Sequence, residues 1–127
     1  MEIIPINGYT IEEKIQIAKK HLLPKLIVEH GIKKENVKFN QKIIEKVITS
    51  YTNESGVRGL EKKLAKLVRN RTKQIAFEES YKALLTNKDV LKSLGPGIDP
   101  RKYTSHLTPG VVTGLAWTRT GGDILFI

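Results

Sequence analysis

The longest predicted helix begins within NESGVRGLEKKL, residues 53–64, and a positive charge lies at its start. Ser55 is a typical N-cap residue, and the leucines that follow it recur at helical spacing. A capping box would place glutamate or glutamine three residues after Ser55, but the sequence has Arg58 there. A cation in the first turn is unfavourable, because a helix N-terminus has unpaired N–H groups and partial positive charge. Arg58 therefore needs a negatively charged partner.

Two kinds of partner would neutralise Arg58. The first is an ion pair with Glu54 or Glu61 on the same helix surface, which contributes about 0.5 kcal/mol or less. The second is an anion bound at the helix start, where phosphates bind because free N–H groups and the helix dipole converge. The residue pattern alone favours the ion pair, and both explanations stay open.

Residues 1–95 have the pattern of a mainly helical domain. Thr10 and Glu13 form a complete capping box, and apolar residues follow at helical spacing. Pro24 ends or kinks this first helix, or opens a second one in its first turn. Gly31 occupies the place of a C-terminal helix cap.

The remainder of this domain is predicted to contain three more helices and two short strands. Asn40 caps the first of these helices, the longest extends over residues 57–79, and a short one ends at Gly95. The strand candidates are residues 37–39 and 82–86, which would pair with each other.

The pattern changes after the helical part. Residues 96–109 contain prolines at positions 96, 100 and 109 and have no hydrophobic periodicity, which predicts a linker. Residues 110–127 contain two strand-like runs around a Gly-Gly pair and predict a β-hairpin. An isolated hairpin is only marginally stable, so we expect these residues to be the truncated start of a second domain.

Composition limits the possible functions. The 127 residues are 39% hydrophobic and 28% charged, which is typical of a soluble globular protein. With no cysteine, disulfides and thiolate metal sites are excluded, and neither a membrane span nor a secretory signal is recognisable. The net charge of +9 would suit a phosphate-bearing partner or an acidic neighbouring domain.

The longest helix carries a row of basic residues on the face opposite its leucines. The row consists of Lys62, Lys66, Arg69 and Lys73. Such a row is the normal solvated face of an amphipathic helix, and it is also the pattern that binds nucleic-acid backbone. No aromatic residues are interleaved for base stacking. The solvated face is therefore the favoured interpretation, and a basic helical nucleic-acid-binding module is the alternative.

Arg71 differs from that row, because it falls on the apolar face of the same helix. Snorkelling of the guanidinium to solvent is the favoured explanation, and a buried carboxylate partner is the second.

No catalytic or metal-binding group stands out. His21, His30 and His106 are too scattered for a metal site, and no nucleophile motif or Walker-type phosphate loop is present. Tyr9 precedes the Thr10 cap and is expected to pack on the first helical turn. A ligand-stacking role for Tyr9 would require proximity to Arg58. We therefore expect that this chain alone is not an enzyme.

Three blocks of the chain resemble the ATP-dependent Lon protease family. They are GYTIEEKIQIAKKHLLPK (8–25), YTNESGVRGLEKKLAKLVR (51–69) and GVVTGLAWTRTGGDILFI (110–127), in the expected order. The resemblance implies that residues 1–95 are the small α-helical lid subdomain of an AAA+ ATPase, with residues 96–109 linking to the protease domain and residues 110–127 beginning it. The first few residues would be the tail of the large nucleotide-binding subdomain.

The resemblance also implies roles for individual residues. Arg58 matches the sensor-2 arginine of the GVR motif, which reaches the phosphates of bound nucleotide, and Tyr9 matches an aromatic on the adenine side. Ile17 and Val57 would line the same cleft. Arg119 departs from the family, in which WTEVGG is common, and makes the hairpin more basic.

For the parent protein, the resemblance implies an ATP-dependent serine protease that forms a homo-oligomeric ring. The Walker motifs would lie upstream of this chain and the Ser-Lys dyad downstream, so the chain itself should hydrolyse neither ATP nor peptides. ATP or ADP with Mg²⁺ would be bound by the full-length protein and not strongly by this part. Partners would be the other domains, unfolded protein substrates and possibly DNA, with no membrane, in the bacterial cytoplasm or alternatively the mitochondrial matrix.

Overall fold

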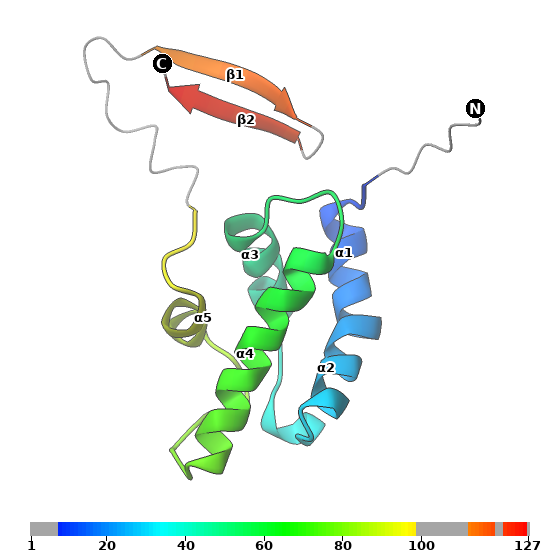
Figure 1. The fold of residues 1–127 in the computed structure, drawn as a ribbon, viewed down its shortest axis with the longest axis vertical. Coiled ribbons are helices and arrows are strands. Elements are labelled where there is room, and N and C mark those ends of the chain that lie inside the picture. The colour runs from blue at the N-terminus through cyan, green and yellow to red at the C-terminus, as the bar shows by residue number, and fades with distance from the viewer. Residues whose placement is uncertain (1–7, 99–111, 119–120, 127) are drawn as a thin grey trace, which may run out of the picture.

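The computed structural model describes residues 8–98, 112–118 and 121–126, and it is a small helical bundle followed by a hairpin (Figure 1). The α-helices are α1 (Ile11–Ile17), α2 (Leu23–Glu29), α3 (Gln41–Tyr51), α4 (Arg58–Ala76) and α5 (Asn87–Leu94). A π-helical turn, η1 (Ala18–Leu22), joins α1 to α2, and a 3₁₀ turn, η2 (Lys34–Asn36), precedes α3. The strands are β1 (Thr113–Thr118) and β2 (Gly121–Phe126). Among these described elements, none is a helix long and apolar enough to cross a membrane.

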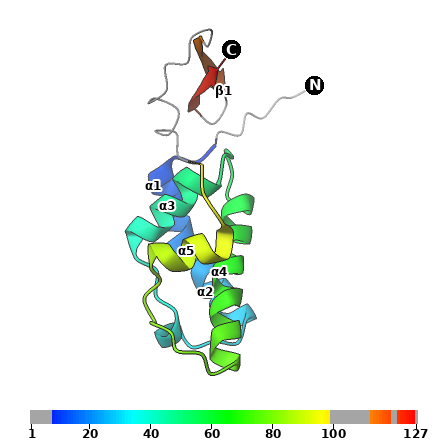
Figure 2. The same ribbon diagram turned by 90° about the vertical axis from the view of Figure 1, so that its left-hand side faces the viewer.

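The first three helical segments form one continuous rod that runs beside α4, and α5 lies across the bundle (Figures 1 and 2). The capping box at its start is confirmed: the Thr10 N–H donates to Glu13 Oε2 at 2.8 Å, and the Glu13 N–H donates to Thr10 Oγ1 at 3.3 Å. Pro24 lies in the first turn of α2, which is one of the three alternatives that the sequence left open. The preceding π-helical turn provides room for the proline ring, which would clash with a carbonyl of a regular helix.

The rod ends in the glycine cap that the sequence predicts. Gly31 has φ +63°, its N–H donates to the Val28 carbonyl at 3.0 Å, and the Ile32 N–H donates to the Ile27 carbonyl at 3.2 Å. These two bonds make a Schellman motif, which satisfies carbonyl groups that the helix leaves unpaired.

One hydrophobic core joins α3, α4, α5 and the rod. The apolar faces predicted for α3 and α4 are buried in it, and its members with 0–1% exposure are Ala18, Ile44, Val47, Leu60, Leu64, Leu67, Val68 and Val90. Burying a side chain of the size of leucine contributes about 1.5–3 kcal/mol. The helical part therefore has a core large enough to fix how its helices pack.

The two predicted short strands are each reduced to one bridging residue. Lys38 and Leu84 form an isolated parallel bridge, in which the Lys38 N–H donates to the Ala83 carbonyl at 2.7 Å and the Leu85 N–H donates to the Lys38 carbonyl at 3.0 Å. Their pairing was predicted correctly, but their description as strands was wrong. Only Val37 and Leu85 beside the bridge are buried, in a small cluster with Ile27, so there is little apolar surface to extend a ladder.

The predicted end of the longest helix is also corrected. Helix α4 ends at Ala76, three residues before the expected end, because Glu78 adopts φ +52°. The Glu78 N–H donates to the Ile75 carbonyl at 3.2 Å and the Glu79 N–H donates to the Gln74 carbonyl at 3.0 Å, which is again a Schellman arrangement. Residue type does not predict this cap, because glutamate occupies the position where glycine is usual.

The hairpin is present, but its glycine pair does not form the turn. Gly121 pairs with Thr118 and Gly122 with Trp117 in the antiparallel register, so both glycines belong to β2. Residues 119–120, between the strands, lie outside the described residues. Trp117 is 91% exposed. The assignment of this hairpin to a second domain stays a prediction.

The start of the predicted linker is attached to α3. The Ile98 N–H donates to the Ser50 carbonyl at 2.8 Å, and the Tyr51 hydroxyl donates to the Gly95 carbonyl at 2.8 Å. The rest of residues 96–109 lies outside the described residues, as do residues 1–7, which include the first few residues that the resemblance assigns to a neighbouring subdomain. The division at residues 95 and 109 therefore stays a prediction.

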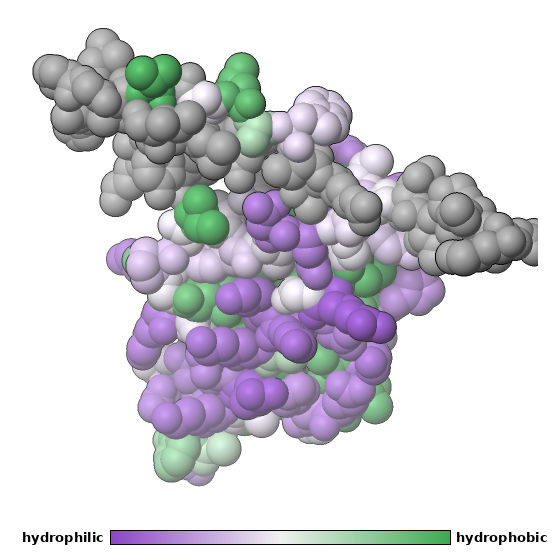
Figure 3. Space-filling model, turned by 45° about the horizontal axis from the view of Figure 1, so that its top comes forward, coloured by the Kyte–Doolittle hydropathy of each residue, from purple (hydrophilic) through white to green (hydrophobic). Residues whose placement is uncertain are grey.

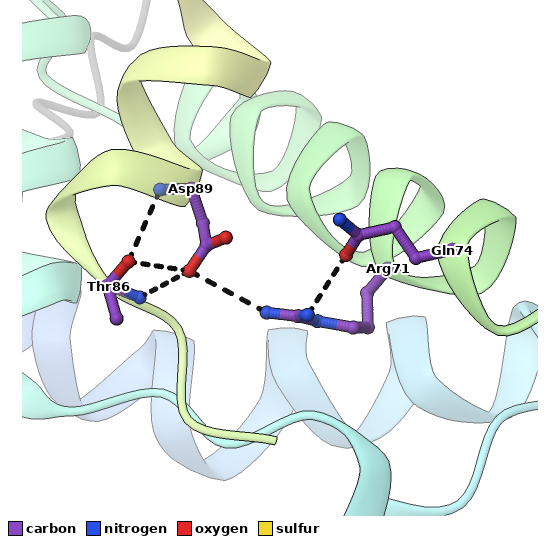
Figure 4. A network of polar contacts seen from close by, with 4 residues as sticks. All are labelled: Arg71, Gln74, Thr86 and Asp89. Carbon is purple, nitrogen blue, oxygen red and sulfur yellow. Dashed lines mark hydrogen bonds and ion pairs between the residues drawn. The ribbon is translucent and has the colours of Figure 1, made fainter. Parts of the chain in front are cut away.

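Arg71 is buried, with 2% exposure, so the expectation that it snorkels to solvent is wrong. Its Nη2 lies 3.7 Å from Asp89 Oδ2, and its Nη1 donates to Gln74 Oε1 at 2.9 Å (Figure 4). The same Asp89 oxygen accepts hydrogen bonds from the Thr86 N–H and hydroxyl, at 2.8 and 2.7 Å. One carboxylate thus completes the capping box of α5 and faces the buried guanidinium of α4.

Asp89 should make the stability of the bundle depend on pH. Burial acts to raise the pKa of its carboxyl group, but hydrogen bonds from Thr86 and the charges of Arg71 and Lys92 outweigh burial, and the pKa is lowered. A lowered native pKa contributes stability above the unfolded value of about 3.9, and this contribution is lost as the pH falls through the native pKa. We expect Asp89→Asn to cost about 2 kcal/mol of unfolding free energy at pH 7 and less at pH 3, measured by urea unfolding.

The control for this measurement is Glu45→Gln, since Glu45 is an exposed carboxylate on α3. It should have little effect at either pH. An equal loss at pH 7 and pH 3 for Asp89→Asn would contradict the ionic role of Asp89.

Candidate functional site

The start of α4 is capped by the side chain of Glu54. Glu54 Oε2 accepts a hydrogen bond from the Gly59 N–H and Oε1 accepts one from the Leu60 N–H, both at 2.8 Å. The N-cap residue is Val57, which makes no side-chain cap, so the expectation that Ser55 caps this helix is wrong. A glutamate side chain is long enough to reach back from the preceding loop. The free N–H groups and the helix dipole are thereby satisfied by a carboxylate of the chain itself.

Gly59 allows the Glu54 carboxylate to approach so closely. A Cβ atom at position 59 would lie 3.0–3.1 Å from the carboxylate atoms of Glu54, which is tighter than ordinary van der Waals contact. Any larger residue at position 59 would therefore push the carboxylate away from the N–H groups that it caps. A glutamate five residues before a glycine in the first turn is the sequence signal for this cap.

Lys14 holds the same loop from the other side. This lysine of α1 is only 7% exposed, and its ammonium donates a hydrogen bond to the backbone carbonyl of Glu54. The neighbouring Ser55 carbonyl accepts the Tyr9 N–H at 2.9 Å. Sequence reasoning did not single out Lys14, although its position three residues after Ile11 and four before Ala18 places it on the apolar side of the helix.

Arg58 is the first residue of α4, and its side chain is exposed. Neither predicted intrachain partner pairs with it: Glu54 caps the helix, and Glu61 Oε1 accepts a hydrogen bond from Lys25 Nζ at 2.8 Å. That bond, together with the charges of Glu61 and Glu29, raises the pKa of Lys25. Within the described residues, no carboxylate lies within 4.0 Å of the Arg58 guanidinium.

The other residues predicted for a nucleotide cleft occupy two kinds of position. Tyr9 is 50% exposed and lies beside the Glu54 loop through its backbone bond to Ser55, so it is not buried in the core. Val57 and Ile17 are partly buried and pack against the main hydrophobic core. Tyr9, Val57 and Arg58 thus lie in or directly beside the loop that precedes α4. Ile17 lies elsewhere, at the end of helix α1.

The basic row on α4 is solvent-exposed along its whole length, at Lys62, Lys66, Arg69 and Lys73. Figure 3 shows a largely hydrophilic surface over the helical part in the face that it presents. Lys73 also lies 5.7 Å from the centre of the Phe77 ring. This arrangement is the solvated face that the sequence favoured.

The two histidines in the described part of the chain do not assemble a metal site. His30 Nδ1 lies 2.9 Å from the Leu26 carbonyl, His21 is exposed, and His106 lies outside the described residues. Among the described side chains, no group of three or more metal-binding types comes together.

Comparison with solved structures identifies this bundle. The Bacillus subtilis Lon protease SSD domain matches with a TM-score of 0.56 and 43% sequence identity, covering 72% of this chain and 97% of that domain. The chain belongs to the Lon protease family. Residues 28–84 match the family described as the Lon protease AAA+ ATPase lid domain, so the mainly helical lid fold predicted from the sequence is confirmed.

Curated Lon relatives extend the similarity to the whole chain. The Lon proteases of Flavobacterium johnsoniae and Karelsulcia muelleri are 50% and 52% identical over 128 and 127 aligned residues. Each alignment includes all of this chain but only 16% and 15% of those proteins. A Lon lid domain implies further domains in the same polypeptide.

The Glu54 cap can be tested by comparing two neighbouring substitutions. Glu54→Ala should lower the unfolding free energy by about 1–2 kcal/mol, because it leaves two N–H groups of α4 without their acceptor. Ser55→Ala should change it by less than about 0.5 kcal/mol, since the Ser55 hydroxyl does not cap the helix. Urea unfolding of both variants measures the difference, and equal losses would contradict the assignment of the cap.

Proposed function

We propose that this chain is the nucleotide-responsive lid of an ATP-dependent Lon-type serine protease, with Arg58 as its sensor-2 arginine. The observation that carries the proposal is that Arg58 is exposed at the first position of α4 while both nearby glutamates are engaged elsewhere. A guanidinium that pairs with no carboxylate of the described residues is available to a phosphate, which it can hold through two parallel hydrogen bonds.

The chain offers part of a nucleotide site. Arg58 supplies donors for phosphate oxygens, exposed Tyr9 supplies an aromatic face for a base, and Val57 and Ile17 supply apolar walls. A cleft of about 740 Å³ between α3 and α5 is lined by neither Tyr9 nor Arg58. The nucleotide site is therefore composite, and the large nucleotide-binding subdomain supplies the Walker residues and the ligands for Mg²⁺.

The lid acts through the change in what Arg58 can hold. Arg58 binds the phosphates of ATP in one state and loses part of those contacts after hydrolysis, so the lid occupies different positions in the two states. ATP hydrolysis supplies the free energy for the cycle. Repeated lid movement in a ring of identical subunits pulls unfolded protein toward the Ser-Lys centre of the protease domain, in the bacterial cytoplasm. The Walker residues and the Ser-Lys dyad of the other domains carry out the two reactions, and Arg58 contributes contacts to the phosphates.

The sensor role is tested by Arg58→Ala in the full-length protein, with Arg69→Ala as the matched control on the same helix. We expect Arg58→Ala to reduce ATP hydrolysis and ATP-dependent protein degradation by about tenfold or more, which corresponds to the loss of one charged contact of about 1.4 kcal/mol. Cleavage of a short peptide that needs no unfolding should be retained. Equal activity of Arg58→Ala and the wild type, or an equal loss in Arg69→Ala, would contradict the proposal.

A second candidate function is nucleic-acid binding by the basic row on α4. The exposure of all four basic residues favours it, because phosphates could approach Lys62, Lys66, Arg69 and Lys73. DNA affinity should then fall steeply with salt, and reversing the charges of Lys66 and Arg69 should lower both the affinity and the salt dependence. Weak binding that this double substitution leaves unchanged would exclude the row as a DNA site.

A further inference from the structure

Lys14 has an unusual environment for a lysine. Its side chain is buried, and its ammonium bonds to the neutral backbone carbonyl of Glu54. Among the described residues, no carboxylate lies within 4.0 Å of this ammonium. Burying a charge without an opposite charge is costly, so a lysine here is not explained by stability alone.

The Lys14 bond acts on the residue that sets the start of α4. Glu54 is held at two points: its carbonyl accepts from Lys14, and its carboxylate accepts from Gly59 and Leu60. The backbone of Arg58 lies between the loop that Lys14 fixes and the two N–H groups that Glu54 caps. Charge-assisted hydrogen bonds at both points are stronger and shorter than neutral ones, which limits movement of the first helical turn.

We propose that Lys14 and Glu54 are positioning residues for Arg58, an inference that rests on the sensor role proposed above. Lys14 fixes the main chain of Glu54, Glu54 fixes the first turn of α4, and this turn sets the direction from which the Arg58 side chain extends. A site that recognises phosphate through a planar guanidinium depends on such support, because a small misplacement weakens both hydrogen bonds of the fork.

The structure provides a matched control in Lys19. This exposed lysine also bonds from the N-terminal rod to a neighbouring part of the bundle, because its Nζ donates to Gln41 Oε1 at 2.7 Å, at the start of α3. Lys14→Met and Lys19→Met each remove one lysine bond that the rod makes. Only the first removes a bond to the loop that precedes Arg58.

The experiment is a double-mutant cycle in the full-length protein, with the affinity for a fluorescent ADP analogue as the readout. We expect Arg58→Ala and Lys14→Met each to weaken binding by about tenfold, and the double variant to bind no more weakly than Arg58→Ala alone. Lys19→Met should bind as the wild type does. Circular dichroism and cleavage of a short peptide confirm that each variant is folded.

The outcomes separate this inference from the proposed function. If Arg58→Ala leaves the affinity unchanged, the sensor role fails and the inference fails with it. If Arg58→Ala weakens binding but Lys14→Met has no effect, or its effect adds fully to that of Arg58→Ala, only the positioning role is overturned. Should Lys14→Met fail to fold, Glu54→Gln replaces it in the same cycle, with the same non-additivity expected and the same additive result overturning the inference.

Discussion

The hydrogen bonds from Gly59 and Leu60 to the Glu54 carboxylate are the interaction on which the rest of this lid depends. They satisfy the start of α4, the longest helix, whose apolar face forms much of the core. They also decide what Arg58 can do. The Glu54 carboxylate is an anion that the chain itself supplies to the helix start, so no external anion is needed to pair the N–H groups there. The side chain of Arg58 is exposed to solvent. The Glu54 carboxylate offsets the partial positive charge of the helix start, so the positive charge of Arg58 no longer needs an anion at that place.

The same end of the bundle also holds the start of the predicted linker. The Tyr51 hydroxyl, in the last residue of α3, donates to the Gly95 carbonyl at 2.8 Å, and the Ser50 carbonyl accepts the Ile98 N–H at 2.8 Å. Glu54 follows Tyr51 by three residues. The loop that carries the Arg58 site and the segment that leads into the predicted linker are therefore both attached to one helix end. This short connection joins the loop before Arg58 to the segment beyond α5 without passing through the core.

Local chemistry explains which features the sequence could predict. The capping box at Thr10 and the glycine cap at Gly31 depend on residues within one turn of each other, and both are found in the structure. The helix end at Glu78 was missed because backbone geometry there is set without glycine. The Glu54 cap was missed because its side chain reaches across a loop instead of standing at the usual N-cap position. The environment of Arg71 depends on where α5 docks, which periodicity along α4 does not reveal.

A structure of the full-length protein with bound ADP tests the central claim most directly. The claim is that Glu54 caps α4 and so leaves Arg58 available to the nucleotide. The account predicts Arg58 within hydrogen-bond distance of a phosphate oxygen, while both Glu54 oxygens stay on the N–H groups of Gly59 and Leu60. A phosphate bound in place of the Glu54 carboxylate, or an Arg58 side chain paired with Glu54 and turned away from the nucleotide, would contradict it.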